Sequence, residues 1–319
     1  MNYQHILYPF LGALIATFLL TIIFRYFGKK GVLGNLFTAV RGGTPRALGI
    51  VPFILLSLYF PSEFNDLILI IGAFAFMDDL LGRRKIGNLP IEWGQLCRGI
   101  GMILVILVGF YFTPVGYSAI LIALLVQPIN ISDMQPGSTS MVVMIMSTFV
   151  ILAMFLIGVG PIFEIPAFYA PLIVLVVCLG YCPLDFAGKI MLGEIGNHSF
   201  AVALGICFFM LGGFWATLIL FIATTVLIAL IRRNSLTIFF ARKLNLKDPT
   251  FGDFVMDVLT GGGLGDVFRR IFLRRKQIRV TNPIFISLGF RRLLFNPYAL
   301  NTPSPTYSKY KPVSPLERK

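Results

Sequence analysis

The chain has 319 residues, of which 57% are hydrophobic and only 13% are charged, and its mean hydropathy is +0.84. A water-soluble domain could not bury this much apolar surface, so the composition excludes an ordinary soluble protein. It indicates one polytopic domain of helices that satisfy their own backbone groups inside a bilayer. The net charge is +13, and a membrane protein sorts such cations by side.

The apolar stretches predict an all-α bundle of about nine to ten transmembrane helices. Several are shorter than the ~20 residues that a perpendicular span prefers, so they would need flanking residues or a thinner bilayer. A tenth span or a re-entrant segment within 280–300 is left open. The predicted spans are 6–27, 47–60, 66–78, 99–113, 115–129, 140–160, 167–183, 200–212 and 214–231.

The positions of Lys and Arg predict how these helices are oriented. With the N-terminus outside, the external segments contain neither residue type; these segments are 1–5, 61–65, 113–116, 158–166 and 212–213. The positive-inside rule then places the remaining loops in the cytoplasm, which are 28–46, 79–98, 130–139, 184–199 and everything after Ile231. Lys29 and Lys30 follow the first span, which predicts an uncleaved anchor and not a secretory signal peptide.

The first polar segment on the predicted cytoplasmic side carries two adjacent carboxylates. Asp78 and Asp79 follow an apolar run and precede Arg83, Arg84 and Lys85. Carboxylates at the end of a membrane helix are costly unless they pair with a cation or a metal. The alternative interpretation is a simple helix end that the arginines neutralise.

The second and third polar segments lie on the same predicted face. Asn130 and Asp133 open a loop that ends in a turn, and Glu194, Asn197 and His198 directly precede an apolar span. The N-terminus of that span would favour an anion such as phosphate. Three segments with carboxylate oxygens on one face predict a magnesium and phosphate site.

Four segments, in this order, carry a resemblance to a known family. They are Arg41-Gly-Gly-Thr-Pro-Arg-Ala-Leu-Gly49, Asp78-Asp79, Asn130-x-x-Asp133-x-x-Pro136-Gly137 and Met191-Leu-Gly-Glu-x-Gly-Asn with Leu204-Gly205. Over about residues 28–232 the chain resembles the polyprenyl-phosphate N-acetylhexosamine-1-phosphate transferases, the bacterial MraY and WecA group.

The resemblance implies a reaction at the cytoplasmic face of the bacterial inner membrane. Undecaprenyl phosphate would attack the sugar-linked phosphorus of a UDP-N-acetylhexosamine, which gives a lipid-diphosphate sugar and UMP for cell-envelope polysaccharide synthesis. Mg²⁺, with Mn²⁺ as a substitute, would neutralise the diphosphate. A homodimer is left open.

The resemblance also implies a role for each matched residue. Catalysis would involve Asp78, Asp79, Asp133 and Glu194, of which Asp79, Asp133 and Glu194 would bind the metal. Substrate binding would involve Gly43, Pro45, Arg83, Arg84, Lys85, Asn130, Asn197 and His198. The three cations could instead form a solvated cluster, and His198 could cap or pack instead of contacting substrate.

Departures from the family pattern keep a second function open. Glu194 stands where the family has Asp, Gln135 and Ser138 stand where arginines are usual, and the only histidines are His5 and His198. The alternative is therefore an impaired relative that binds lipid phosphate or a partner enzyme. A transporter or flippase is less favoured, since it would place polar residues near the bilayer midplane.

The C-terminal part is predicted to be a separate basic segment. We divide the chain into a transferase-like membrane domain (1–232), a basic amphipathic segment (233–300) and a disordered tail (301–319). Residues 267–279 mix cations with large apolar side chains, which predicts a helix on anionic membrane lipids and argues against nucleic acid as a partner.

Overall fold

The chain forms two compact units. In the computed structural model, unit 1 spans Met1–Arg232 and unit 2 spans Arg233–Lys319. The structure describes residues 4–82, 84–87, 92–162, 165–244, 246, 248–261, 263–274, 276–296 and 299.

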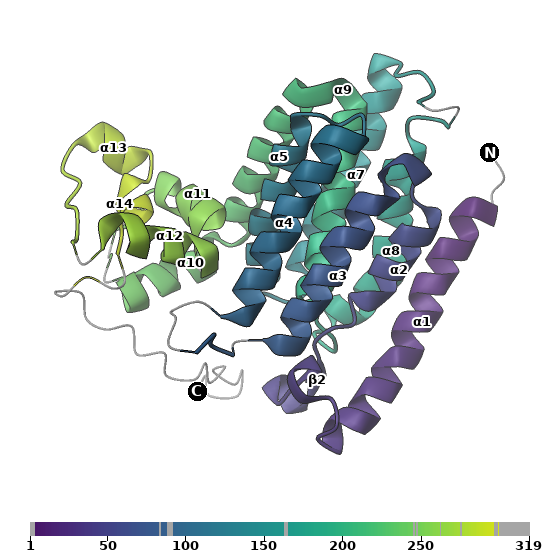
Figure 1. Cartoon of the computed structure of the whole chain (residues 1–319), viewed down its shortest axis with the longest axis horizontal. Coiled ribbons are helices and arrows are strands. Elements are labelled where there is room, and N and C mark those ends of the chain that lie inside the picture. Colours follow the sequence, from purple (N-terminus) through teal and green to yellow (C-terminus); the bar gives the residue numbers. More distant parts are fainter. Residues whose placement is uncertain are drawn as a thin grey trace. The chain divides into compact units, whose positions relative to one another are not determined.

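Unit 1 is a helix bundle that includes a small antiparallel hairpin (Figure 1). Its helices are α1 (Gln4–Lys29), α2 (Ile50–Tyr59), α3 (Asn65–Leu81), α4 (Trp93–Phe112), α5 (Ser118–Leu124), α6 (Val126–Ser132), α7 (Ser138–Ile157), α8 (Tyr169–Phe186) and α9 (Gly193–Ile231). The hairpin pairs β1 (Phe37–Thr38) with β2 (Thr44–Pro45), and short 3-10 turns cover Gly34–Leu36, Val40–Gly42 and Ser62–Phe64.

The prediction of an all-α membrane protein is confirmed in outline. Each predicted apolar span overlaps a helix, and among the described residues five helices, α1, α4, α7, α8 and α9, are long and apolar enough to cross a bilayer. The helices Ile50–Tyr59 and Ser118–Ser132 are apolar but shorter. On α1, large apolar side chains such as Phe18 (57% exposed) point outward, as expected where lipid is the solvent.

Helix ends differ from the predicted spans where polar residues find partners in space. α4 begins at Trp93, because Glu92 and Gln95 form a reciprocal capping box there. The predicted spans 200–212 and 214–231 belong to one element, α9, which is broken at Gly212–Gly213. Gly213 has φ +66°, a left-handed conformation that favours glycine.

The first half of α9 is the centre of unit 1. α9 contacts α2, α3, α5, α6, α7 and α8, and its residues from Gly193 to Phe208 are buried except for Glu194, which is partly exposed. Small residues allow this close packing: a Cβ on Gly205 would lie 3.1 Å from the Cα of Ile122 in α5. The start of α9 is therefore held from several sides.

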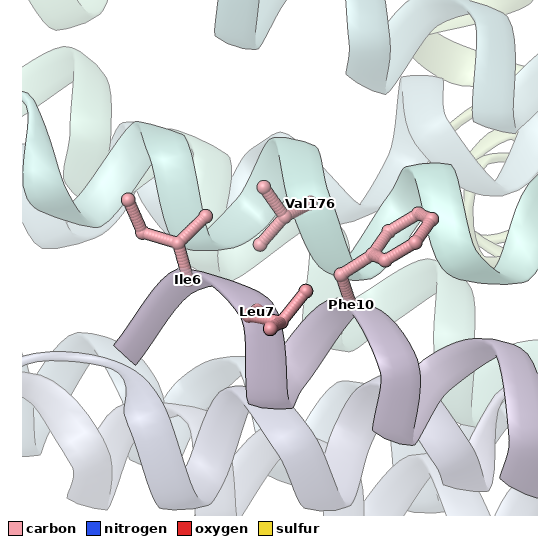
Figure 2. A pocket seen from close by; sticks show the side chains of 4 residues that line it. All are labelled: Ile6, Leu7, Phe10 and Val176. Carbon is pink, nitrogen blue, oxygen red and sulfur yellow. The ribbon is translucent and has the colours of Figure 1, made fainter. Parts of the chain in front are cut away.

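α1 lies along one side of the bundle, against α2 and α8 (Figure 1). Figure 2 shows a pocket between α1 and α8 that Ile6, Leu7, Phe10 and Val176 line. Its lining is wholly apolar, which suits contact with hydrocarbon and offers no group for phosphate chemistry.

Unit 2 is built from short helices. They are α10 (Arg233–Phe239), a π-helical turn (Phe240–Leu244), α11 (Phe251–Thr260), α12 (Gly263–Leu273), α13 (Pro283–Ser287) and α14 (Phe290–Leu293). α13 is about 8 Å long at the rise of an α-helix, far shorter than a bilayer core of ~30 Å. It therefore does not provide the additional span considered for 280–300, and the tail 301–319 lies outside the described residues.

Candidate functional site

Asp79, at the C-terminal end of α3, caps the N-terminus of α9. Its Oδ1 accepts a hydrogen bond from the backbone N–H of Glu194 at 3.1 Å, and its Oδ2 accepts one from that of Ile195 at 3.0 Å. The first N–H groups of a helix lack intrahelical partners and attract negative charge. The buried carboxylate thus joins two segments that lie more than a hundred residues apart.

The Gly-Thr-Pro segment docks on the residues that lead into α9. The N–H of Met191 donates to the Pro45 carbonyl at 2.9 Å, and the N–H of Gly49 donates to the Leu192 carbonyl at 3.0 Å. The two backbones approach so closely that a Cβ on Gly49 would lie 2.3 Å from the Leu192 oxygen. Only glycine fits this contact.

Arg98, in the first turns of α4, bridges two carboxylates. Its Nη2 lies 2.9 Å from Asp78 Oδ2 and 2.7 Å from Glu194 Oε2. The three side chains are nearly buried, with exposed fractions of 9 to 13%. Buried charges are stable only when they are paired in this way.

Arg46 and His198 complete the surroundings of Glu194. Arg46 Nη2 lies 3.8 Å from Glu194 Oε1, and its Nε lies 3.6 Å from Asp79 Oδ1. His198 is fully buried one turn along α9, with its Nε2 3.3 Å from Glu194 Oε2. Arg46 is the most exposed of these ion-pair partners, at 28%, so it can reach an incoming ligand.

Asn197 connects α9 to the second polar segment. Its Nδ2 donates to Asp133 Oδ2 at 3.0 Å and lies 3.5 Å from Asn130 Oδ1. Its buried Oδ1 has no hydrogen-bond partner among the described residues. Burial, reinforced by the charge of Asp185, raises the pKa of Asp133 well above its ordinary value. A bound cation would stabilise the charged form of the Asp133 carboxylate and give the Asn197 Oδ1 atom a partner.

The remaining predicted site residues form no side-chain contact with these carboxylates among the residues that the structure describes. Gly43 (φ +109°) closes the β1–β2 hairpin, and Pro45 contributes its carbonyl to the docking contact. Arg84 and Lys85 are exposed and form no ion pair within the described part of the chain. Arg83 lies outside the described residues.

Arg46 and Arg98 are the central cations that sequence reasoning did not select. Arg46 lies inside the recognised Gly-Thr-Pro segment, but nothing in the pattern shows that it faces Asp79. Arg98 could have been identified from the sequence, since it is the only Lys or Arg between Lys85 and Lys189. A lone cation beside a predicted span indicates a carboxylate partner.

The donor chemistry of this cluster fits a hard divalent cation. Three carboxylates, those of Asp78, Asp79 and Glu194, pair with the guanidinium groups of Arg46 and Arg98. The carboxylate of Asp133 is joined to this cluster through the Asn197 amide. Carboxylate and amide oxygens are the ligands that Mg²⁺ prefers, and the unpartnered Asn197 Oδ1 adds one such oxygen. In the part of the chain that the structure describes, no three His, Cys, Asp or Glu side chains already converge as ligands of one ion.

Comparison of the sequence with models of known protein families and with curated proteins finds no match. The candidate site therefore rests on the contacts of this chain and on its sequence patterns. We name it the Glu194 cluster and define it as Arg46, Asp78, Asp79, Arg98, Asn130, Asp133, Glu194, Asn197 and His198.

Proposed function

We propose that this protein transfers a sugar 1-phosphate, in particular an N-acetylhexosamine 1-phosphate, from a UDP-sugar to undecaprenyl phosphate. One observation carries the proposal. The four segments that resemble the transferase family meet through direct contacts: Pro45 with Met191, Asp79 with the first turn of α9, and Asn197 with Asp133. The resulting buried charged cluster lies at one end of a helix bundle, where a membrane lipid phosphate and a soluble nucleotide can meet.

The proposed reaction is an exchange at phosphorus. An oxygen of the lipid phosphate forms a bond to the sugar-linked phosphorus, while the bond from that phosphorus to the bridging oxygen breaks. UMP leaves with the electron pair, and the product is a lipid-diphosphate sugar. Such chemistry depends mainly on positioning and charge stabilisation.

The residues of the Glu194 cluster divide these tasks. Arg46, the most exposed of its ion-paired side chains, supplies positive charge toward the phosphates. Arg98 holds Asp78 and Glu194 together, and Asp78 orients the lipid phosphate and accepts its proton. Asn130 contacts the nucleotide.

Mg²⁺ or Mn²⁺ would be held by Asp133, Glu194 and the Asn197 amide oxygen, with Asp79 as a further donor. Both Asp79 oxygens accept backbone N–H bonds, yet each carboxylate oxygen has a second lone pair for a metal. When bound, the ion neutralises the diphosphate.

A second candidate is an impaired relative that only binds lipid phosphate or a partner enzyme. The observation that favours it is that Asp78, Asp79 and Glu194 are already compensated within the protein, by Arg98, by Arg46 and by backbone N–H groups. Such a cluster can hold its shape without a metal.

A reconstituted assay separates the two candidates. Purified full-length protein in lipid nanodiscs is incubated with Mg²⁺, undecaprenyl phosphate and UDP-N-acetylglucosamine or UDP-N-acetylgalactosamine. The transferase releases UMP and lipid-diphosphate sugar in equal amounts, and either omission of the lipid or addition of EDTA stops both. No product with either sugar, together with a rise in melting temperature on adding undecaprenyl phosphate, would establish the second candidate instead.

A further inference from the structure

The positive charge of this protein is concentrated in unit 2. Residues 233–319 contain sixteen Lys and Arg against five acids, a net charge of +11, whereas the whole chain carries +13. Unit 1, with the Glu194 cluster, is therefore nearly neutral. The reaction proposed for unit 1 does not account for this partition.

Three acids of unit 2 are neutralised inside the unit. Asp253 pairs with Arg291 at 2.7 Å, Asp257 pairs with Arg292 at 2.5 Å, and Asp266 pairs with Arg269 at 2.6 Å. Arg269 and Arg292 are buried. These three acids therefore do not offset the cations that the structure shows exposed in this unit, which are Arg233, Arg242, Arg270, Arg274, Lys276 and Arg279.

The helix α12 exposes large apolar side chains together with Arg270, while its Arg269 is buried. Arg269 points inward and donates to the Thr260 carbonyl at 2.7 Å. Phe268, Ile271 and Phe272, at i, i+3 and i+4, form an outward face and are 58%, 62% and 78% exposed. A face of this composition indicates an apolar partner.

Exposed cations follow directly after this apolar face. Arg274, Lys276 and Arg279 are exposed and form no ion pair with the described residues. The backbone is held at two of these residues, because Asn296 Nδ2 donates to the carbonyls of Arg274 and Lys276 at 2.9 and 3.1 Å. Apolar and basic groups are therefore offered side by side in one ordered structure.

We propose that the surface formed by Phe268, Ile271, Phe272, Arg274, Lys276 and Arg279, which we name the α12 surface, binds the anionic surface of the bilayer. Aromatic and aliphatic side chains enter the boundary between headgroups and acyl chains, while Lys and Arg contact anionic headgroups. The charges are complementary to such a surface, and no acid lies among the six residues. Unit 2 also begins two residues after α9, a helix able to cross the bilayer, so the membrane surface is within reach.

Spin labelling of the full-length protein tests this proposal. Cys97, the one cysteine that is not buried, is replaced by Ser, and a nitroxide is attached at Phe272→Cys or, as the control, at the exposed position Asp248→Cys. The protein is reconstituted in phosphatidylcholine vesicles with or without phosphatidylglycerol. Collisions are measured with oxygen, which concentrates in lipid, and with a water-soluble nickel chelate.

In vesicles with phosphatidylglycerol we expect the label at 272 to collide mainly with oxygen and the label at 248 mainly with the nickel chelate. Replacing Arg274, Lys276 and Arg279 together by Gln should weaken this insertion by on the order of a hundredfold. A label at 272 that meets the nickel chelate in both lipids overturns the proposal. Insertion of the same extent with and without phosphatidylglycerol, and in the Gln variant, also overturns it. Shielding of the label from both reagents, together with spin–spin broadening, overturns it as well, because a second copy of the protein would then cover the surface.

Discussion

Glu194 is the residue on which the candidate site depends. Arg98, Arg46 and His198 converge on its carboxylate, while its backbone N–H donates to Asp79. The side chain is one methylene longer than the Asp of the family that the sequence resembles. This length lets the carboxylate reach Arg98 at 2.7 Å from a backbone that Asp79 holds in place.

Replacing Arg98 tests whether the ion pairs stabilise the fold. Arg98→Gln leaves Asp78 and Glu194 without their closest cation, so we expect a loss of about 3–5 kcal/mol, the cost of breaking a buried pair. The melting temperature in detergent measures the effect. The double variant Arg98→Gln/Glu194→Gln should recover part of it, and Arg84→Gln, at an exposed position, should change nothing. An Arg98→Gln protein as stable as wild type would show that the bridge has no structural role.

Asp79→Asn tests the cap of α9. The amide has one acceptor oxygen where the carboxylate has two, so one of the N–H groups of Glu194 and Ile195 loses its partner. We expect a loss of about 1–2 kcal/mol in stability and, for a transferase, at least about a hundredfold loss of UMP release. Asp66→Asn makes the same chemical change at the exposed start of α3 and should be neutral in both measurements. Equal activity of the two variants would remove Asp79 from the site.

At the scale of elements, the site depends on how closely the Gly-Thr-Pro segment approaches α9. Gly49→Ala would place a Cβ 2.3 Å from the Leu192 oxygen, so the segments must separate. We expect a lower melting temperature and weakened UMP release. Gly160→Ala is the matched control, because a Cβ there meets nothing within 4 Å. A fully active and stable Gly49→Ala protein would contradict the role of this contact.

Hydropathy predicted where the helices lie but not where they begin. The apolar spans 99–113 and 200–212 were visible, whereas α4 and α9 start earlier, at Trp93 and Gly193. The extra turns carry Arg98 and Glu194, and they are helical because Glu92 and Asp79 cap them. Asp79 is distant in sequence, so the second cap could not be read from a local pattern.

The candidate residues were predictable in part. Asp78, Asp79, Asp133, Glu194 and Asn197 were selected as carboxylate and amide groups on one face, and the structure brings them together. Arg46 and Arg98 were not selected. The isolation of Arg98 among uncharged residues indicated a carboxylate partner, but not which one, because its pairing with Asp78 and Glu194 depends on the packing of α3, α4 and α9. For Arg46 the local sequence carries no such signal.

At the scale of the whole molecule, the orientation in the membrane stays a prediction that labelling can test. Ser132 and Asn197 are buried, so the exposed positions Met134 and Lys189 in the same segments are the suitable sites. Met134→Cys and Lys189→Cys should react with an impermeant thiol reagent only after permeabilisation, whereas Ser62→Cys and Gly160→Cys should react in intact cells. Labelling of position 134 from outside would place the Glu194 cluster on the outer face of the membrane and contradict the predicted cytoplasmic orientation.

The most direct test of the proposed function compares UMP release by wild type, Glu194→Gln and Glu63→Gln. Each protein is placed in nanodiscs with Mg²⁺ and undecaprenyl phosphate, and either UDP-N-acetylglucosamine or UDP-N-acetylgalactosamine is added. Glu63 lies in the turn before α3, at the other end of that helix from Asp78, so its variant controls for the chemical change alone. We expect wild type and Glu63→Gln to release UMP equally. Glu194→Gln should be slower by at least about a hundredfold, since a neutral amide is a poorer partner for Mg²⁺ and for Arg98. Equal release by wild type and Glu194→Gln would contradict the assignment of the Glu194 cluster as the catalytic site.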